Sequence, residues 1–145
     1  MTFTSIKTAA ISLTLIASLA APAMAGGNRV HIQQRGWDHG LAGSQSGHWQ
    51  RMTIIQRGIG NTTVSSQDGR RNKTVVGQSG RRHNAETRQN GRRNILGVAQ
   101  FGRHQKADVV QTGRNNAIGV IQAGKGNRTV ARQHGEGNIA VIIQD

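Results

Sequence analysis

Residues 111–122 read QTGRNNAIGVIQ, and this unit recurs along the chain with a spacing of eleven residues. Each unit opens with a glutamine, has a glycine two residues later, and places a hydrogen-bonding side chain five residues after the glutamine. Self-similarity at a constant period indicates an architecture of stacked units. The glutamines are Gln34, Gln45, Gln56, Gln67, Gln78, Gln89, Gln100, Gln111, Gln122, Gln133 and Gln144. The glycines are Gly36, Gly47, Gly58, Gly69, Gly80, Gly91, Gly102, Gly113, Gly124 and Gly135. The third position holds Asn61, Asn72, Asn94, Asn116, Asn127 and Asn138, and elsewhere His39, Gln50, His83 and Gln105.

Each unit divides into an alternating segment and a segment that contains the glycine. In residues 94–100, the side chains of Leu96 and Val98 would share one side of a β-strand with Asn94 and Gln100, as a period of two requires. We therefore predict strands of seven residues. The other four residues, such as 101–104, are predicted to form turns, because glycine and charged residues gather there.

The fold predicted is an all-β, two-sheet β-solenoid with amyloid-like cross-β stacking. Two 11-residue half-repeats would form one 22-residue coil, because a single unit has too little apolar surface to bury a core of its own. Inward residues are large in one set of strands, such as Leu96 and Val98, and small in the other, such as Ala85 and Thr87. Large residues are therefore expected to face small ones across a thin core, as close packing demands.

The glutamines and asparagines at the strand ends would stack on their copies in neighbouring coils. Such stacks form amide ladders in cross-β assemblies. Because an unpaired buried amide costs about 1–3 kcal/mol, burial is tolerable only if each amide bonds the next one. The strict spacing favours ladders over amides that are merely solvated.

The repeat resembles a known family. The spacing Gln-x-Gly-x-x-Asn-x-Ala-x-x-x-Gln, nearly complete in residues 111–122, is similar to the curlin repeat of curli fibre subunits, and the similarity covers almost all of residues 26–145. A small residue two positions after the Asn slot is usual in that family and occurs here as Ala85, Ala107 and Ala140. The resemblance implies a homopolymer nucleated at the cell surface, a second curlin-repeat subunit, an outer-membrane export pore, and roles in adhesion and biofilm matrix.

The first 25 residues have the pattern of a secretory signal peptide. Lys7 precedes an apolar run, and Ala23-Met24-Ala25 forms a small-x-small cleavage site before Gly26. The run is shorter than the roughly 20 apolar residues of a membrane-spanning helix. We predict residues 1–25 as a signal peptide, residues 26–145 as the solenoid domain, and an extracellular location.

Composition offers no candidate for catalysis or cofactor binding. The chain has six acidic residues and no cysteine, and the acids recur at no single repeat position. The six histidines also occupy different repeat positions and lack metal-site spacing. No enzyme activity, cofactor or metal is therefore expected.

Basic residues dominate the charge. Removing Lys7 with the signal peptide lowers the formal net charge from +13 to +12, which makes anionic partners plausible. Successive turns would lie at opposite edges, so the arginines should form two ridges. No recognition helix or row of aromatic residues suggests reading of a nucleic-acid sequence. The ridge residues are Arg70, Arg71, Arg92, Arg93 and Arg114 on one edge, and Arg81, Arg82, Arg103 and Lys125 on the other.

Two functions fit these features. The first is a secreted structural subunit of curli-like amyloid fibres. The alternative is a monomeric basic β-solenoid that binds anionic polymers such as DNA, lipopolysaccharide or acidic polysaccharide. A monomer should protect its terminal strands with charge, proline or a capping element, and residues 26–145 contain no proline. The uncharged segment 138–144 is further expected to be a docking edge for the next subunit.

Overall fold

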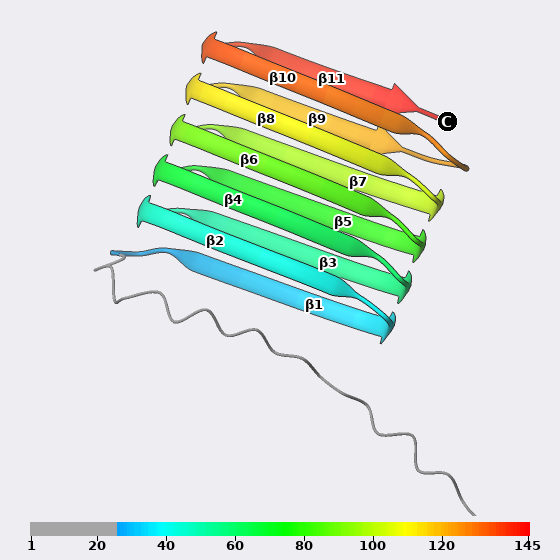
Figure 1. Ribbon diagram of the computed structural model, residues 1–145. Helices are drawn as coiled ribbons and strands as arrows, with labels where there is room; N and C mark the ends of the chain where they lie inside the picture. Colours follow the sequence, from blue (N-terminus) through cyan, green and yellow to red (C-terminus); the bar gives the residue numbers. More distant parts are fainter. Residues whose placement is uncertain (1–25) are drawn as a thin grey trace, which may run out of the picture.

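The computed structural model describes residues 26–145 as eleven strands stacked in two parallel sheets (Figure 1). The predicted signal peptide, residues 1–25, lies outside the described residues. Among residues 26–145 no helix is long and apolar enough to cross a membrane. The strands are β1 (Arg29–Trp37), β2 (Gly40–His48), β3 (Arg51–Ile59), β4 (Thr62–Arg70), β5 (Lys73–Arg81), β6 (Asn84–Arg92), β7 (Ile95–Arg103), β8 (Lys106–Arg114), β9 (Ala117–Gln122), β10 (Arg128–Glu136) and β11 (Ile139–Gln144).

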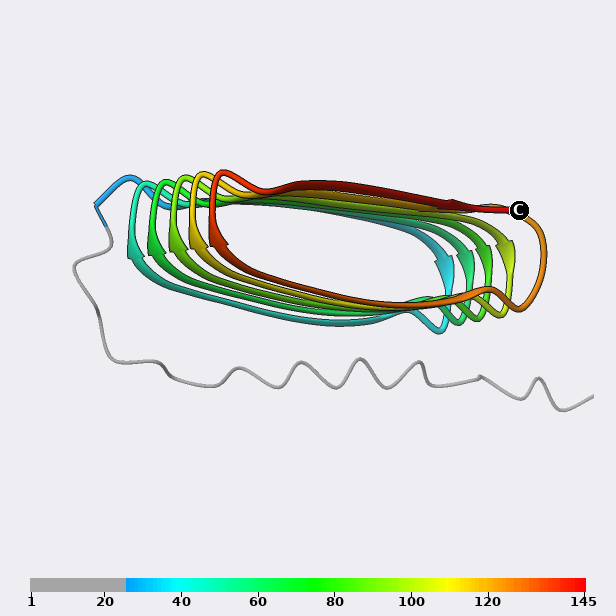
Figure 2. The same ribbon diagram turned by 90° about the horizontal axis from the view of Figure 1, so that it is seen from above.

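Odd and even strands separate into two sheets, which confirms the predicted two-sheet solenoid of 22-residue coils. One sheet has the order β1-β3-β5-β7-β9-β11 and the other β10-β8-β6-β4-β2. Every pairing is parallel and joins residues 22 apart, as in Gln78↔Gln100. Seen from above, the coils form a flattened oval with one sheet along each long side (Figure 2).

The strands are longer than the alternation predicted. Nine of them have nine residues rather than seven, and they end three residues beyond the repeat glutamine. The predicted turn glycines, except Gly124, are therefore the last-but-one residues of strands. The connections between most strands shrink to two residues, such as Arg71 and Asn72.

A column of glycines explains this extension. Gly58 has φ +117°, and a Cβ placed on it would lie 1.9 Å from the carbonyl oxygen of Gly80 in the next coil. Only glycine tolerates both this backbone angle and this close approach of backbone to backbone. The strand pairing continues through the column, as the register pair Gly58↔Gly80 shows.

The core lies between the sheets and has the predicted large-against-small packing. Leu96 and Ile54 of one sheet are fully buried, as are Ala85 and Ala107 of the other. At Gly43 a Cβ would come within 3.2 Å of the Met52 sulfur, so a small residue of one sheet makes room for a large residue of the other. Such interdigitation gives the density of a protein interior.

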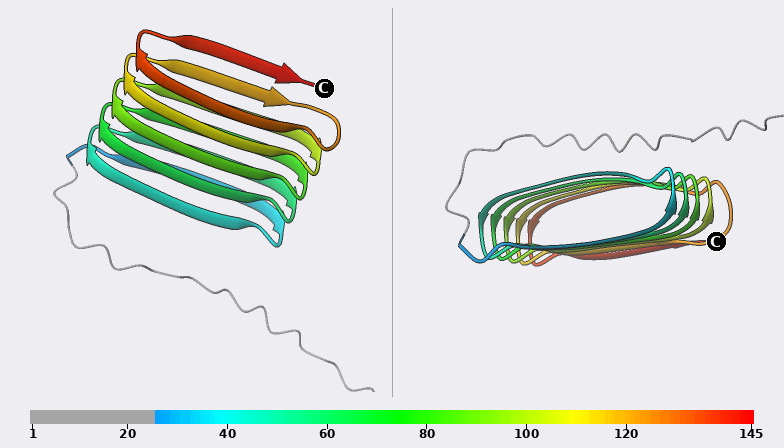
Figure 3. Two further views of the ribbon diagram at one scale, coloured as in Figure 1. Left: turned by 45° about the horizontal axis from the view of Figure 1, so that its top comes forward. Right: turned by 90° about the horizontal axis from the view of Figure 1, so that it is seen from below.

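Both ends of the stack are open in the described part of the chain. At the β1 end, the inward side chains of Val30 and Ile32 are 55% and 46% exposed, because no coil covers them. At the β11 end, Ala140 and Ile142 are partly exposed. The view from above (Figure 2) and the view from below (Figure 3, right) show no segment of residues 26–145 folded across either end.

Candidate functional site: amide ladders and basic edges

The repeat glutamines form two continuous ladders, one in each sheet. In each pair the Nε2 of one glutamine donates to the Oε1 of the glutamine 22 residues later, as in Gln78 to Gln100 at 2.9 Å and Gln100 to Gln122 at 2.8 Å. The odd-strand ladder runs through Gln34, Gln56, Gln78, Gln100, Gln122 and Gln144 with distances of 2.7–2.9 Å. The even-strand ladder runs through Gln45, Gln67, Gln89, Gln111 and Gln133 with distances of 2.7–3.0 Å.

The glutamines also tie the two sheets together. Gln100 Nε2 donates at 3.1 Å to the Asn84 carbonyl in the opposite sheet, and Gln122 Nε2 donates at 3.1 Å to the Lys106 carbonyl. Both amide protons of these side chains are thereby used within the core. Their burial is compensated by hydrogen bonds, as buried polar groups require.

The asparagines were expected to form amide-to-amide ladders too, and that expectation is wrong. Asn94 Oδ1 accepts from the backbone N–H of Asn116 at 3.1 Å. Its Nδ2 donates to the backbone carbonyls of Asn90 at 3.2 Å and Gly113 at 2.9 Å. The asparagine amide therefore binds the backbone at the corner of the coil rather than the amide of its copy. Asn61, Asn72 and Asn116 bind the backbone in the same way, while Asn127 and Asn138 donate to the carbonyl four residues before them.

At the position five residues after the repeat glutamine, some units have His83, Gln50 or Gln105 in place of asparagine. His83 imitates asparagine, since its Nδ1 lies 3.4 Å from the Gln105 backbone nitrogen and its Nε2 lies 3.2 Å from the Ser79 carbonyl oxygen. Burial lowers the pKa of His83 below 6.5, which favours the neutral ring. Gln50 and Gln105 fit less well, because the Oε1 of each is buried within residues 26–145 without a hydrogen-bond partner.

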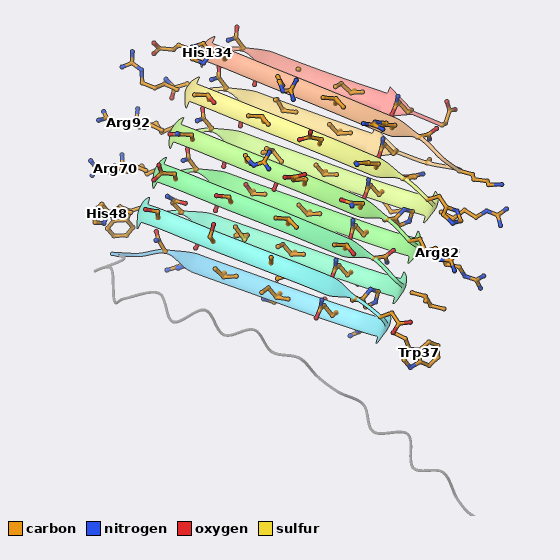
Figure 4. The ribbon with its side chains drawn as sticks, in the orientation of Figure 1. Trp37, His48, Arg70, Arg82, Arg92 and His134 are labelled. Atoms are coloured by element: carbon orange, nitrogen blue, oxygen red, sulfur yellow. The ribbon has the colours of Figure 1, made fainter. Side chains whose placement is uncertain are left out.

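One edge of the solenoid, which we call the arginine edge, carries three adjacent columns of cations. Figure 4 shows Arg70 and Arg92 projecting from it at the ends of β4 and β6. Around Arg70, Arg71, Arg92, Arg93 and Arg114 lies a hollow of about 250 Å³. The columns are the strand-end residues Arg70, Arg92 and Arg114, the connection residues Arg71 and Arg93, and the first residues of odd strands Arg29, Arg51 and Lys73.

The opposite edge holds the second predicted ridge. Arg81 and Arg103 end β5 and β7, and Arg103 pairs with Lys125 in an isolated parallel bridge. Arg82 follows in the connection and is seen on this edge in Figure 4. The two ridges therefore have the composition that the sequence predicted. The only carboxylate paired with any ridge residue in the described chain is Glu136, 3.0 Å from Arg114.

Three arginines of these edges have a left-handed backbone. The φ angles of Arg71, Arg82 and Arg93 are 58°, 55° and 55°. Asparagine or glycine adopts this conformation more readily than a long side chain does. The equivalent position of other connections holds Asn115 or Gly137, as this preference would predict.

The sequence did not identify Trp49 as part of the arginine edge, where it lines a hollow beside the cations. It follows β2 on the arginine edge, with φ 60°, and is 59% exposed. Arg29, on the preceding coil, lines the same hollow as Trp49 and Arg51, and only the closing of the coil brings it there. Within residues 26–145 no group of three or more histidine and acidic side chains is placed to hold a metal ion.

No protein-family model matches the chain, and no curated protein matches it.

Proposed function

We propose that this chain is a secreted structural subunit that polymerises end to end into curli-like amyloid fibres at the cell surface. The observation that carries the proposal is the polarity of the glutamine ladders. At the β1 end, Gln34 and Gln45 each donate into the stack, and nothing within residues 26–145 donates to their Oε1 atoms. That end therefore presents ladder acceptors.

The β11 end presents the complementary donors. Gln133 and Gln144 accept from the ladder beneath them, and their Nε2 groups bond only to backbone carbonyls at 3.4 Å within the described chain. A second copy stacked on this end would supply acceptors through its own Gln34 and Gln45. Unpaired strand edges at both ends template the same addition, so each added subunit recreates the end it covers.

The resemblance to the curlin repeat supports the wider setting of this proposal. It suggests export through an outer-membrane pore, a second curlin-repeat subunit as partner, and roles in adhesion and biofilm matrix. Cleavage after Ala25 would be shown by a secreted product whose first residue is Gly26. Secreted material that retains Met1 would contradict the signal-peptide assignment.

Fibre growth by the purified chain tests the central claim. After dilution from denaturant, we expect a lag, binding of amyloid dyes, and a diffraction spacing near 4.8 Å along the fibre, about the distance between paired strands. A chain that folds and stays monomeric at high concentration would overturn the proposal. That result would favour the alternative, a monomeric solenoid that binds anionic polymers.

A further inference from the structure

A groove runs along the arginine edge between two of its columns. Arg29, Arg51 and Lys73 line one wall, and Trp49, Arg71 and Arg93 line the other. The groove has a volume of about 490 Å³, and no acidic residue lines it. Five cations thus surround a continuous hollow that is parallel to the stack axis.

The backbone of the second wall is unfavourable for the side chains it carries. Trp49, Arg71 and Arg93 all have left-handed φ angles of 55–60°. Bulky residues rarely hold this conformation, which the repeat imposes on the first residue of each two-residue connection. Gly27 lies one coil below Trp49 and Asn115 one coil above Arg93, so smaller residues fit the same column.

The indole of Trp49 is held in place. A Cβ on Gly27 would lie 2.6 Å from the Trp49 Cε3 atom, so the ring occupies the space that glycine leaves. The Trp49 backbone N–H also donates to the Gly26 carbonyl at 3.0 Å. The groove therefore combines an anchored, half-exposed aromatic surface with arginines whose planar forks suit carboxylate and sulfate groups.

We propose that this groove binds a linear acidic polysaccharide. A sugar ring would stack on Trp49, while the anionic groups of successive sugars would pair with arginines spaced by the strand repeat of about 4.8 Å. A single-stranded nucleic acid is recognised by several stacking platforms in a row, and this groove has one aromatic side chain. The proposal is independent of polymerisation, since the groove lies within a single chain.

Binding of the chain to immobilised polygalacturonate tests the proposal. Arg71→Asn and Arg93→Asn remove charge and suit the left-handed backbone, so folding should be preserved. We expect each to weaken binding about threefold and the pair about tenfold. Arg82→Asn is the matched control, because it has the same backbone conformation on the opposite edge. Equal losses from Arg82→Asn and Arg71→Asn would overturn a localised site.

Trp49→Asn tests the role of the aromatic ring. It should weaken polygalacturonate binding severalfold but leave binding of inorganic polyphosphate unchanged, since polyphosphate has no ring to stack. Polygalacturonate should quench tryptophan fluorescence in the Trp37→Phe variant and not in Trp49→Asn. Tighter binding of polythymidylate than of polygalacturonate, with equal quenching, would overturn the polysaccharide assignment in favour of nucleic acid.

Discussion

Gln100 accepts a hydrogen bond from Gln78 at 2.9 Å and donates one to Gln122 at 2.8 Å, so it joins three successive coils through one buried amide. Without that amide, the Gln78 Nε2 donor and the Gln122 Oε1 acceptor lose their ladder partners. Because each unmatched buried group costs about 1–3 kcal/mol, we expect Gln100→Ala to destabilise the fold by about 3 kcal/mol.

Arg103→Ala is the control for that substitution. Arg103 is exposed at the end of β7, and exposed substitutions usually change stability by less than about 0.5 kcal/mol. Urea unfolding of the soluble chain would measure both effects, and the fibre lag time should lengthen in the same order. Equal changes in the two variants would contradict a ladder that stabilises the stack.

The slot occupied by Gln105 should be improved by asparagine. Gln105 Oε1 is buried without a partner, whereas Asn94 in the equivalent place binds a backbone N–H of the next coil. We expect Gln105→Asn to raise the free energy of unfolding by about 1 kcal/mol. The reverse exchange, Asn94→Gln, should lower it by a similar amount, and a gain in stability from Asn94→Gln would disprove this explanation.

His83 should make stability depend on pH. Burial holds its pKa below 6.5, so the folded chain binds fewer protons than the unfolded chain once the pH falls below about 6.5. The free energy of unfolding should therefore decrease as the pH drops from 6.5 toward the folded pKa, and level off below it. His83→Asn should remove this component from denaturation curves measured at several pH values. An identical pH profile in His83→Asn would rule the histidine out.

A charge on the open inner surface should block growth. Ile32 points into the uncovered β1 end and is 46% exposed, so Ile32→Lys should prevent a second copy from covering it, because an unpaired buried charge is costly. Val64→Lys is the control, since Val64 is 43% exposed but lies on the outer face of β4. We expect fibre elongation to slow at least tenfold in Ile32→Lys only. Seeded growth rates would measure it, and equal slowing in both variants would argue against growth at the β1 end.

Replacing an arginine whose backbone is left-handed by asparagine should stabilise the fold. Arg82 has φ 55°, a backbone angle that asparagine adopts more readily than arginine. We therefore expect Arg82→Asn to raise the free energy of unfolding by about 1 kcal/mol. Arg81→Asn, one residue earlier at the end of β5, is the control and should change little. Loss of stability in Arg82→Asn would show that the arginine side chain itself supports the fold.

Much of the architecture follows from the 11-residue spacing alone. Positions such as Gln78 and Gln100 recur strictly, and a parallel stack is the arrangement that places every copy beside its equivalent. The burial of Leu96 against small residues of the other sheet follows from the same period, because alternation assigns each side chain to one face.

Features that depend on distances between coils could not be predicted from the sequence. The strands extend through Gly58 because glycine leaves room for the next coil, where a Cβ on Gly58 would lie 1.9 Å from the Gly80 carbonyl oxygen. The asparagines bind backbone groups of neighbouring coils. Neither contact is visible in the local sequence. The groove that Trp49 shares with Arg71 and Arg93 likewise exists only after successive coils stack. The 11-residue period shows which residues repeat and face inward, because periodicity is a local property of the chain. The structure decided which groups meet across coils, because those meetings depend on how the backbone closes each turn.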